Sequence, residues 1–221
     1  MRGLEMAKPK RSAATSGART KPTRFLLFIY RMPAKPTAAR VGVWRHLKKI
    51  GAIYLQQSVC VFPDNAHIRR EMRPIIGRID EAGGEYHLLA LRQPSPPETQ
   101  KLLQQFVAET SRRYQEIIEN CEVNFQKEIE FETFRKNFTY EEAEEIRNEF
   151  EKIVNWFNEV EERDWFNAPN RAEAADWLKR CESLLEEFEG RVYEIQEKTT
   201  GSEEPSASAR RASGVRLVPS V

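Results

Sequence analysis

Ten arginines and lysines in the first half of the chain are the side chains best suited to bind a ligand. They lie beside the first predicted strand and on two predicted helices, at Arg24, Arg31, Lys35, Arg40, Arg45, Lys48, Lys49, Arg69, Arg70 and Arg73. Cationic groups on one surface neutralise phosphates and release counterions, and the same groups can hold a small oxyanion. The set predicts a nucleic-acid surface or an oxyanion site. A solvated basic face that only pairs with acidic groups elsewhere in the chain explains it equally well.

Carboxylates dominate the second half and offer a different chemistry. Spacings of three or four residues place pairs of them on one helical face, at Glu128, Glu132, Glu142 and Glu145. Such pairs can line a metal or proton-transfer site, but a solvated helix surface explains them better, and we interpret them as structural. Arg163 and Asp164 stand beside two aromatic residues at a predicted helix end, where we expect them to cap or bridge helices.

Other catalytic signatures are missing from the sequence. It contains no glycine-rich phosphate loop and no Gly-x-Ser-x-Gly, and its cysteines and histidines show no metal-ligand spacing. We therefore predict no catalytic residue, no metal and no cofactor. Cys60, Cys121 and Cys181 are expected to be buried structural thiols in a reducing cytosol. No apolar run approaches the roughly 20 residues of a membrane span, so we predict a cytoplasmic protein with no membrane partner.

The net charge of +1 conceals two halves of opposite sign. Residues 25–95 contain 11 basic and 5 acidic residues, whereas residues 96–200 contain 14 and 26. Composition and charge together predict four segments. These are a disordered basic arm at 1–22, a first domain at 23–94, an acidic helical domain at 95–198 and a disordered tail at 199–221.

The first of these domains shows the element order β-α-β-β-α-β. The pattern predicts a strand at 25–30, a helix at 37–50, a tight hairpin at 52–62, a second helix that ends at Gly83, and a strand at 85–91. This order is that of a ferredoxin-like domain.

Three details of this domain follow from residue types. The apolar stripe of its first helix is predicted to be Ala39, Val43, Trp44, Leu47 and Ile50. Pro74 is expected to kink the second helix. Both alternating sets of the first strand are apolar, so we expect both sheet faces to be covered, by the rest of the chain or by another subunit.

Residues 95–198 predict helices with narrow apolar stripes. Helix-start signals occur at Ser95, Thr139 and Asn170, and the helix after Ser95 is expected to run to about Asn137. Behind the other two signals, apolar residues recur at spacings of three and four. Together with the short connections, these stripes predict an antiparallel three-helix bundle, and the whole chain is predicted to be an α+β protein.

Several segments resemble a known family. Residues 24–197 are similar to the N-terminal domain of the chromate-resistance regulator ChrB, most specifically in the Trp-Arg-x-Leu-Lys-x-x-Gly-Ala stretch at 44–52. Further likeness lies at 54–64, 83–85, 138–140 and 163–166. The first domain also resembles the middle domain of the PaaX repressors, and through it a small nuclease of CRISPR spacer acquisition. That nuclease has an Asp where this chain has Tyr30 and Arg31, so nuclease activity is not expected.

The ChrB resemblance implies a DNA-binding transcriptional regulator of a chromate efflux operon. DNA and chromate, or another oxyanion, are then the expected ligands, with a homodimer and a separately encoded C-terminal-type ChrB domain as expected partners. Two alternatives stay open on the residues. One is an accessory module that partners a sensing or detoxifying domain without binding DNA. The other is a metal-dependent enzyme that uses the carboxylates of the helical domain.

Overall fold

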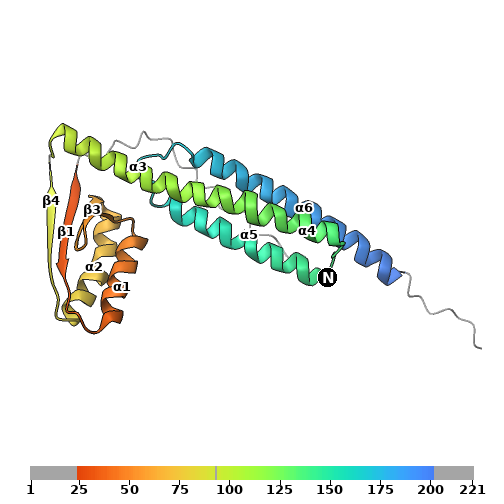
Figure 1. Cartoon of the computed structure of the whole chain (residues 1–221), viewed down its shortest axis with the longest axis horizontal. Coiled ribbons are helices and arrows are strands. Elements are labelled where there is room, and N and C mark those ends of the chain that lie inside the picture. Colours follow the sequence, from red (N-terminus) through yellow and green to blue (C-terminus); the bar gives the residue numbers. More distant parts are fainter. Residues whose placement is uncertain (1–23, 93, 202–221) are drawn as a thin grey trace, which may run out of the picture. The chain divides into compact units, whose positions relative to one another are not determined.

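The structure is a computed structural model that describes residues 24–92 and 94–201 (Figure 1). These residues form two compact units. The sheet unit contains residues up to Arg113 together with Glu159–Arg171, and the helical unit contains Tyr114–Asn158 and the residues from Ala172 onward. The predicted arm at 1–22 and the part of the predicted tail beyond Gly201 lie outside the described residues. The segment limits drawn from composition stay predictions.

The sheet unit combines a four-stranded antiparallel sheet with helices. In chain order it contains β1 (Phe25–Arg31), α1 (Thr37–Lys49), β2 (Ile53–Gln56), β3 (Val59–Pro63), α2 (Ala66–Glu81) and β4 (Glu85–Leu91). The strands lie in the order β2-β3-β1-β4, with β1 between β3 and β4. Helices α1 and α2 cover one face of this sheet (Figure 1). The predicted α+β class is confirmed.

The main core lies between the sheet and these two helices. Leu26, Phe28 and Tyr30 of β1 point to this side, because successive side chains of a strand alternate between its faces. Val43 and Leu47 of α1 meet them, and α2 contributes four more buried side chains, Ile68, Met72, Ile75 and Ile79.

Helix α2 is continuous from Ala66 to Glu81 and contains Pro74. Pro74 is exposed, whereas Met72 and Ile75 on either side of it are buried. The proline ring therefore lies on the solvent side, and the apolar side of the helix stays against the sheet. The helix begins where the Asn65 side chain accepts a hydrogen bond from the Ile68 amide at 2.8 Å.

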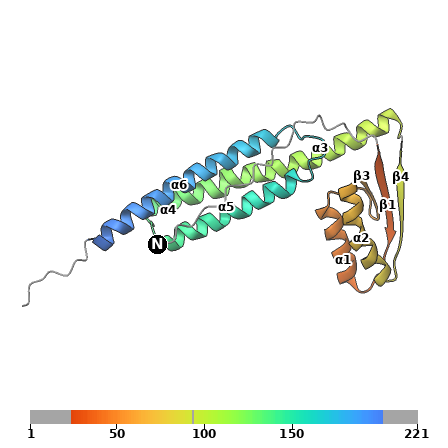
Figure 2. The ribbon, with the colours of Figure 1, turned by 180° about the vertical axis from the view of Figure 1, so that it is seen from behind.

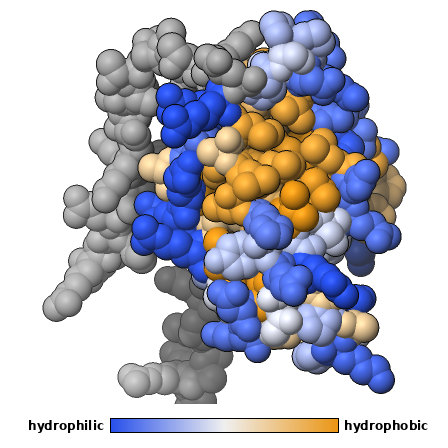
Figure 3. Space-filling view, turned by 90° about the vertical axis from the view of Figure 1, so that its left-hand side faces the viewer, coloured by the Kyte–Doolittle hydropathy of each residue, from blue (hydrophilic) through white to orange (hydrophobic). Residues whose placement is uncertain are grey.

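Among residues 24–92 and 94–201, the second sheet face has its cover at one end. Phe25 and Val61 pack there against Leu102 and Phe106 of α3 (Pro96–Glu119). At this end, the expected cover of the second sheet face is therefore provided by α3 of the same chain. Toward the other end of β4, Leu89 remains 48% exposed. Figure 3 shows the broad hydrophobic area on the side of the molecule where β4 and β1 lie.

The helical unit is built from long helices that lie side by side in both ribbon views (Figure 2). After α3 come a π-helical segment η1 (Asn120–Phe125), α4 (Gln126–Arg135), α5 (Tyr140–Glu161) and α6 (Arg171–Gly201). The ring centres of Tyr114 and Phe157 lie 5.5 Å apart, and those of Phe125 and Phe150 lie 5.7 Å apart. Because Tyr114 belongs to α3 and Phe125 to η1, α5 runs antiparallel to these two segments. Among the described helices, none is both long and apolar enough to cross a membrane.

The helix-start signals locate the observed starts, but the sequence hides an irregularity. Thr139 accepts a hydrogen bond from the Glu142 amide at 3.2 Å, as a capping residue does. Asn170 precedes α6, yet its amide donates to the Ser111 carbonyl instead. The helix predicted to run evenly to about Asn137 contains the π-helical segment and ends at Arg135.

Candidate functional site

A cleft of about 720 Å³ lies between α1, the end of β1 and the β2–β3 hairpin. Its lining residues are Tyr30, Arg31, Met32, Arg40, Val41, Trp44, Tyr54, Gln56, Gln57 and Ser58. They include two guanidinium groups and three aromatic rings, and none of them is acidic. In size and composition the cleft matches sites for small anionic ligands.

Helix α1 positions one wall of the cleft. Arg40, Trp44 and Lys48 are spaced by four residues and therefore share one line along the helix. Trp44 is 48% exposed on this line, so its predicted place in the core stripe is wrong. Val43 and Leu47 hold the core positions, and Trp44 lies about 100° around the helix from Val43.

Two tyrosines form the inner part of the cleft. The hydroxyl oxygens of Tyr30 and Tyr54 lie 3.2 Å apart and share a hydrogen bond. Burial raises the pKa of both phenols, so both stay protonated at neutral pH and can donate hydrogen bonds. Lys48 Nζ lies 5.2 Å from the centre of the Tyr54 ring, which fixes the ammonium beside the cleft by a cation–π contact.

Of the ten predicted basic residues, the structure brings Arg31 and Arg40 into one cleft. Arg45 and Lys49 form a second, exposed line on α1. Arg24 lies apart from them, in a separate hollow of about 750 Å³ that it shares with Arg92.

The basic residues of α2 have other partners. Arg69 forms an ion pair with Asp64, with 2.6 Å between Nε and the carboxylate. Arg70 contacts Glu71 at 3.5 Å and shares a hydrogen bond with His67. Arg73, like Lys35 before α1, is exposed. Arg31 and Arg40 therefore share a cleft that no acidic residue lines, whereas Lys49 lines a hollow together with Glu71, Glu159 and Glu162.

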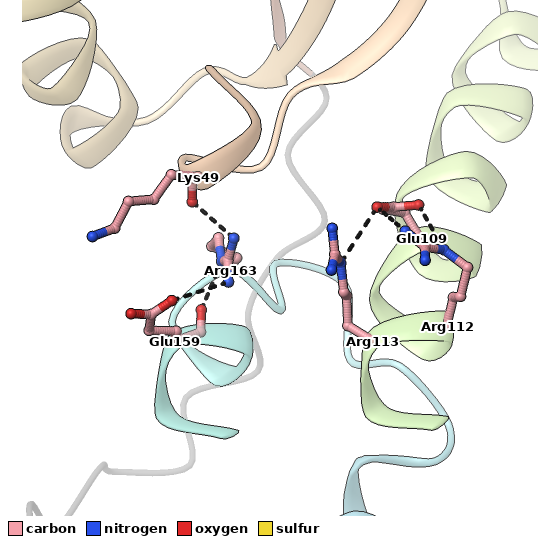
Figure 4. Close-up of polar contacts among 6 residues, drawn as sticks. All are labelled: Lys49, Glu109, Arg112, Arg113, Glu159 and Arg163. Carbon is pink, nitrogen blue, oxygen red and sulfur yellow. Dashed lines mark hydrogen bonds and ion pairs between the residues drawn. The ribbon is translucent and has the colours of Figure 1, made fainter. Parts of the chain in front are cut away.

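Arg163 joins the returning segment of the sheet unit to the end of α1 (Figure 4). Its guanidinium donates to the Lys49 carbonyl at 2.9 Å and to the Glu159 carbonyl at 2.7 Å. The first bond satisfies one of the last carbonyls of α1, which have no partner within the helix. Burial lowers the pKa of Arg163.

Two neighbours of Arg163 also serve the fold. Asp164 is buried and accepts a hydrogen bond from the Ala168 amide at 2.9 Å, which closes the turn that follows. On α3, Glu109 forms ion pairs with Arg112 and Arg113 at 2.7 and 3.6 Å (Figure 4).

The carboxylates of the helical unit meet where α4 ends and α5 begins. Glu128, Glu132 and Glu142 each place an oxygen within 4.8 Å of the others. Glu145 lines a hollow of about 400 Å³ together with Glu128 and Glu142. The Asn137 amide donates to Glu132 at 2.6 Å and to Glu142 at 3.0 Å. One side-chain amide thus bridges two of the three carboxylates and ties the two helices together.

Replacing Glu142 is expected to change the pH dependence of stability. Burial, then Glu132, Glu145 and Glu128, raise its pKa above the ordinary value of 4.5. The folded state thus binds this proton more tightly than the unfolded chain. Its contribution to stability is fully present below pH 4.5 and is lost as the pH rises through the raised pKa. The urea midpoint of Glu142→Gln should therefore gain on that of the wild type as the pH rises.

The matched control for this prediction is Glu144→Gln. It makes the same charge change on an exposed residue of the same helix, and its difference from the wild type should stay nearly constant with pH. Equal pH profiles for the two variants would contradict the prediction.

All three cysteines are free and buried, as predicted. Burial raises the pKa of Cys60 to about 12, which leaves it a thiol at neutral pH. Cys121 and Cys181 share a side-chain hydrogen bond within the helical unit. These thiols therefore belong to the two cores.

Comparison with known proteins places the sequence in one family. The model of the family described as "Protein ChrB, N-terminal" matches residues 40–199. The match begins at Arg40 within α1, includes the cationic lines described above and extends through the helical unit. No curated protein and no solved structure matches the chain. The predicted resemblance is confirmed: the chain belongs to the ChrB N-terminal family, which relates it to chromate resistance.

Proposed function

We propose that the chain is a DNA-binding transcriptional regulator of a chromate efflux operon. The observation that carries the proposal is the exposed cationic surface of α1, where Arg45 and Lys49 lie next to the line of Arg40 and Lys48. Cations that project from a helix surface can reach successive phosphates of a duplex. Family membership supports the proposal, because this is a family of regulator-type domains and not a known family of enzymes.

The fold supports a finer assignment of the two units. We propose that the sheet unit is a ferredoxin-like domain, given its order of elements and the strand order β2-β3-β1-β4. We propose an antiparallel three-helix bundle for the helical unit, in which aromatic pairs join successive helices. In this arrangement the bundle supports the sheet unit, and the sheet unit carries the DNA contact.

Chromate would act by competition. Chromate and a DNA phosphate are both tetrahedral oxyanions, so cationic groups that hold one also attract the other. An anion bound at α1 would remove positive charge from the DNA-binding surface and release the operator. Sulfate, with the same shape and charge, is the control for a nonspecific salt effect.

The test is DNA binding by Arg45→Gln/Lys49→Gln, measured by fluorescence anisotropy on the DNA upstream of the chain's own gene. The wild type should bind this DNA more tightly than scrambled DNA, and chromate should release it at concentrations at which sulfate does not. The double variant should bind more weakly. Its slope of log affinity against log salt should be smaller by about 2, since about one unit is lost for each phosphate contact removed.

The charge-matched control is Lys152→Gln/Lys179→Gln. These lysines belong to α5 and α6 of the helical unit, and their side chains are 72% and 73% exposed. This variant should keep the wild-type slope. Weak binding that is equal on both DNAs would refute the regulator. Copurification of a stable partner would then support the accessory module.

A further inference from the structure

We infer that the cleft at α1 binds a nucleotide, with its base against Trp44 and its phosphate at Arg31 and Arg40. The inference rests on the proposed function and deepens it, because it adds a second kind of contact with nucleic acid. The α1 line of Arg45 and Lys49 meets phosphates on the outside of a duplex, whereas the cleft takes one nucleotide that is not paired.

The positive charge of the cleft lining favours an anionic ligand. Two guanidinium groups enter its lining and no carboxylate does. In the part of the chain that the structure describes, no ion pair joins Arg31 or Arg40 to an acidic residue. Lys48 adds a third positive charge beside Tyr54. Arginine offers planar, paired donors that suit phosphate oxygens.

The aromatic wall excludes a bare oxyanion as the best ligand. A tetrahedral anion has no flat face to stack on an indole, yet Trp44 borders the cleft with 48% of its surface open. A nucleobase is flat and stacks on such a ring, as bases do in proteins that bind single strands. The cleft of about 720 Å³ is also larger than a phosphate or sulfate requires.

Exposed polar groups of the cleft suit the edge of a base or a sugar. Ser58 and the two amides Gln56 and Gln57 line the side formed by the β2–β3 hairpin. Hydroxyl and amide groups both donate and accept hydrogen bonds, so they can pair with either kind of group on a ligand. One of the phenols of Tyr30 and Tyr54 donates to the other, which leaves the pair one further donor for a ligand. A cleft with a cationic mouth, one stacking face and mixed donors and acceptors has the chemistry of a nucleotide site.

The test is isothermal titration calorimetry with deoxyadenosine monophosphate, inorganic phosphate and deoxyadenosine as separate probes. The monophosphate should bind at least tenfold more tightly than either of the other two. Arg40→Gln and Trp44→Leu should each weaken its binding about tenfold, and Trp44→Phe should restore most of the loss. Both residues are exposed, so these variants should keep the wild-type unfolding midpoint.

Two further arms identify the source of the nucleotide and separate this inference from the proposed function. A 5′-phosphorylated single-stranded oligonucleotide that binds more tightly than the monophosphate, through the same residues, assigns the site to a DNA strand. Tighter binding of the monophosphate assigns it to free nucleotide. Arg45→Gln/Lys49→Gln should weaken duplex binding and leave monophosphate binding unchanged. Two results would overturn the inference. One is that inorganic phosphate binds as tightly as deoxyadenosine monophosphate. The other is that Arg40→Gln and Trp44→Leu both bind the monophosphate as tightly as the wild type does.

Discussion

Gly84→Ala should destabilise the sheet unit by about 3 kcal/mol or more, because no space exists for a methyl group at this position. A Cβ on residue 84 would lie 2.6 Å from the Arg31 carbonyl oxygen and 2.8 Å from Cγ2 of Ile79. The first of these atoms belongs to the backbone of β1 and cannot turn away. The amide of Gly84 also donates to the Ile79 carbonyl at 2.8 Å, which holds the residue against α2. The urea midpoint of the variant should fall accordingly.

A second glycine provides the control. Gly77 lies inside α2, and nothing comes within 4 Å of a Cβ added there. Gly77→Ala should therefore raise stability by about 0.5–1 kcal/mol, the usual gain from replacing a glycine within a helix. The two substitutions add the same methyl group to the same unit. Equal midpoints would show that the close approach of β1 to residue 84 does not govern stability.

Phe106→Ala should cost about 3–5 kcal/mol, the usual range for removing a buried ring. Phe106 is 4% exposed, and its ring centre lies 6.2 Å from that of Phe25 and 5.3 Å from that of Phe166. Its loss would open the covered end of the second sheet face and leave Phe25 against a cavity. The variant should unfold at lower urea concentration and bind more of a hydrophobic dye than the wild type.

Gln104→Ala tests whether the effect belongs to burial or to the helix. Gln104 is exposed on the same turn of α3, and alanine is a better helix former than glutamine. This variant should unfold within about 0.5 kcal/mol of the wild type. If Phe106→Ala did the same, α3 would not be a structural part of the sheet unit.

Local signals in the sequence predict where elements begin and end. The extended run at 25–30, the glycines at 83 and 84, and the polar residue before each long helix all act on their immediate neighbours. Such signals do not depend on the rest of the fold. This explains why α5 and α6 begin directly after Thr139 and Asn170.

The spacing of the buried side chains around the π-helical segment predicts an irregular helix. An assignment of heptads alone does not show it. The buried residues Ile117, Cys121, Phe125 and Ile129 are each four residues apart. In an α-helix each step of four overshoots a full turn by about 40°, so three steps carry the stripe about 120° around. A wider turn at Asn120–Phe125 keeps these side chains on the core side.

The sequence predicts that the candidate site is positively charged, but it does not predict the shape of the cleft. The basic residues of α1 were visible in the sequence, and so was their spacing. That Arg31 would share a cleft with Arg40 depends on where β1 ends relative to α1, which only the packed sheet fixes. The sequence does contain a signal for Trp44, since a tryptophan four residues from both an arginine and a lysine lies on the same line of the helix as they do.

The return of Glu159–Arg171 to the sheet unit also has a consequence for synthesis on the ribosome. All four strands emerge early. Arg163, which binds the carbonyl at the end of α1, and Phe166, which packs on Phe106, emerge only after the whole of α5. At about 5–20 residues per second, the interval between β4 and this segment lasts several seconds. During that time the nascent sheet lacks part of its apolar cover, and we expect that exposed surface to be prone to aggregation.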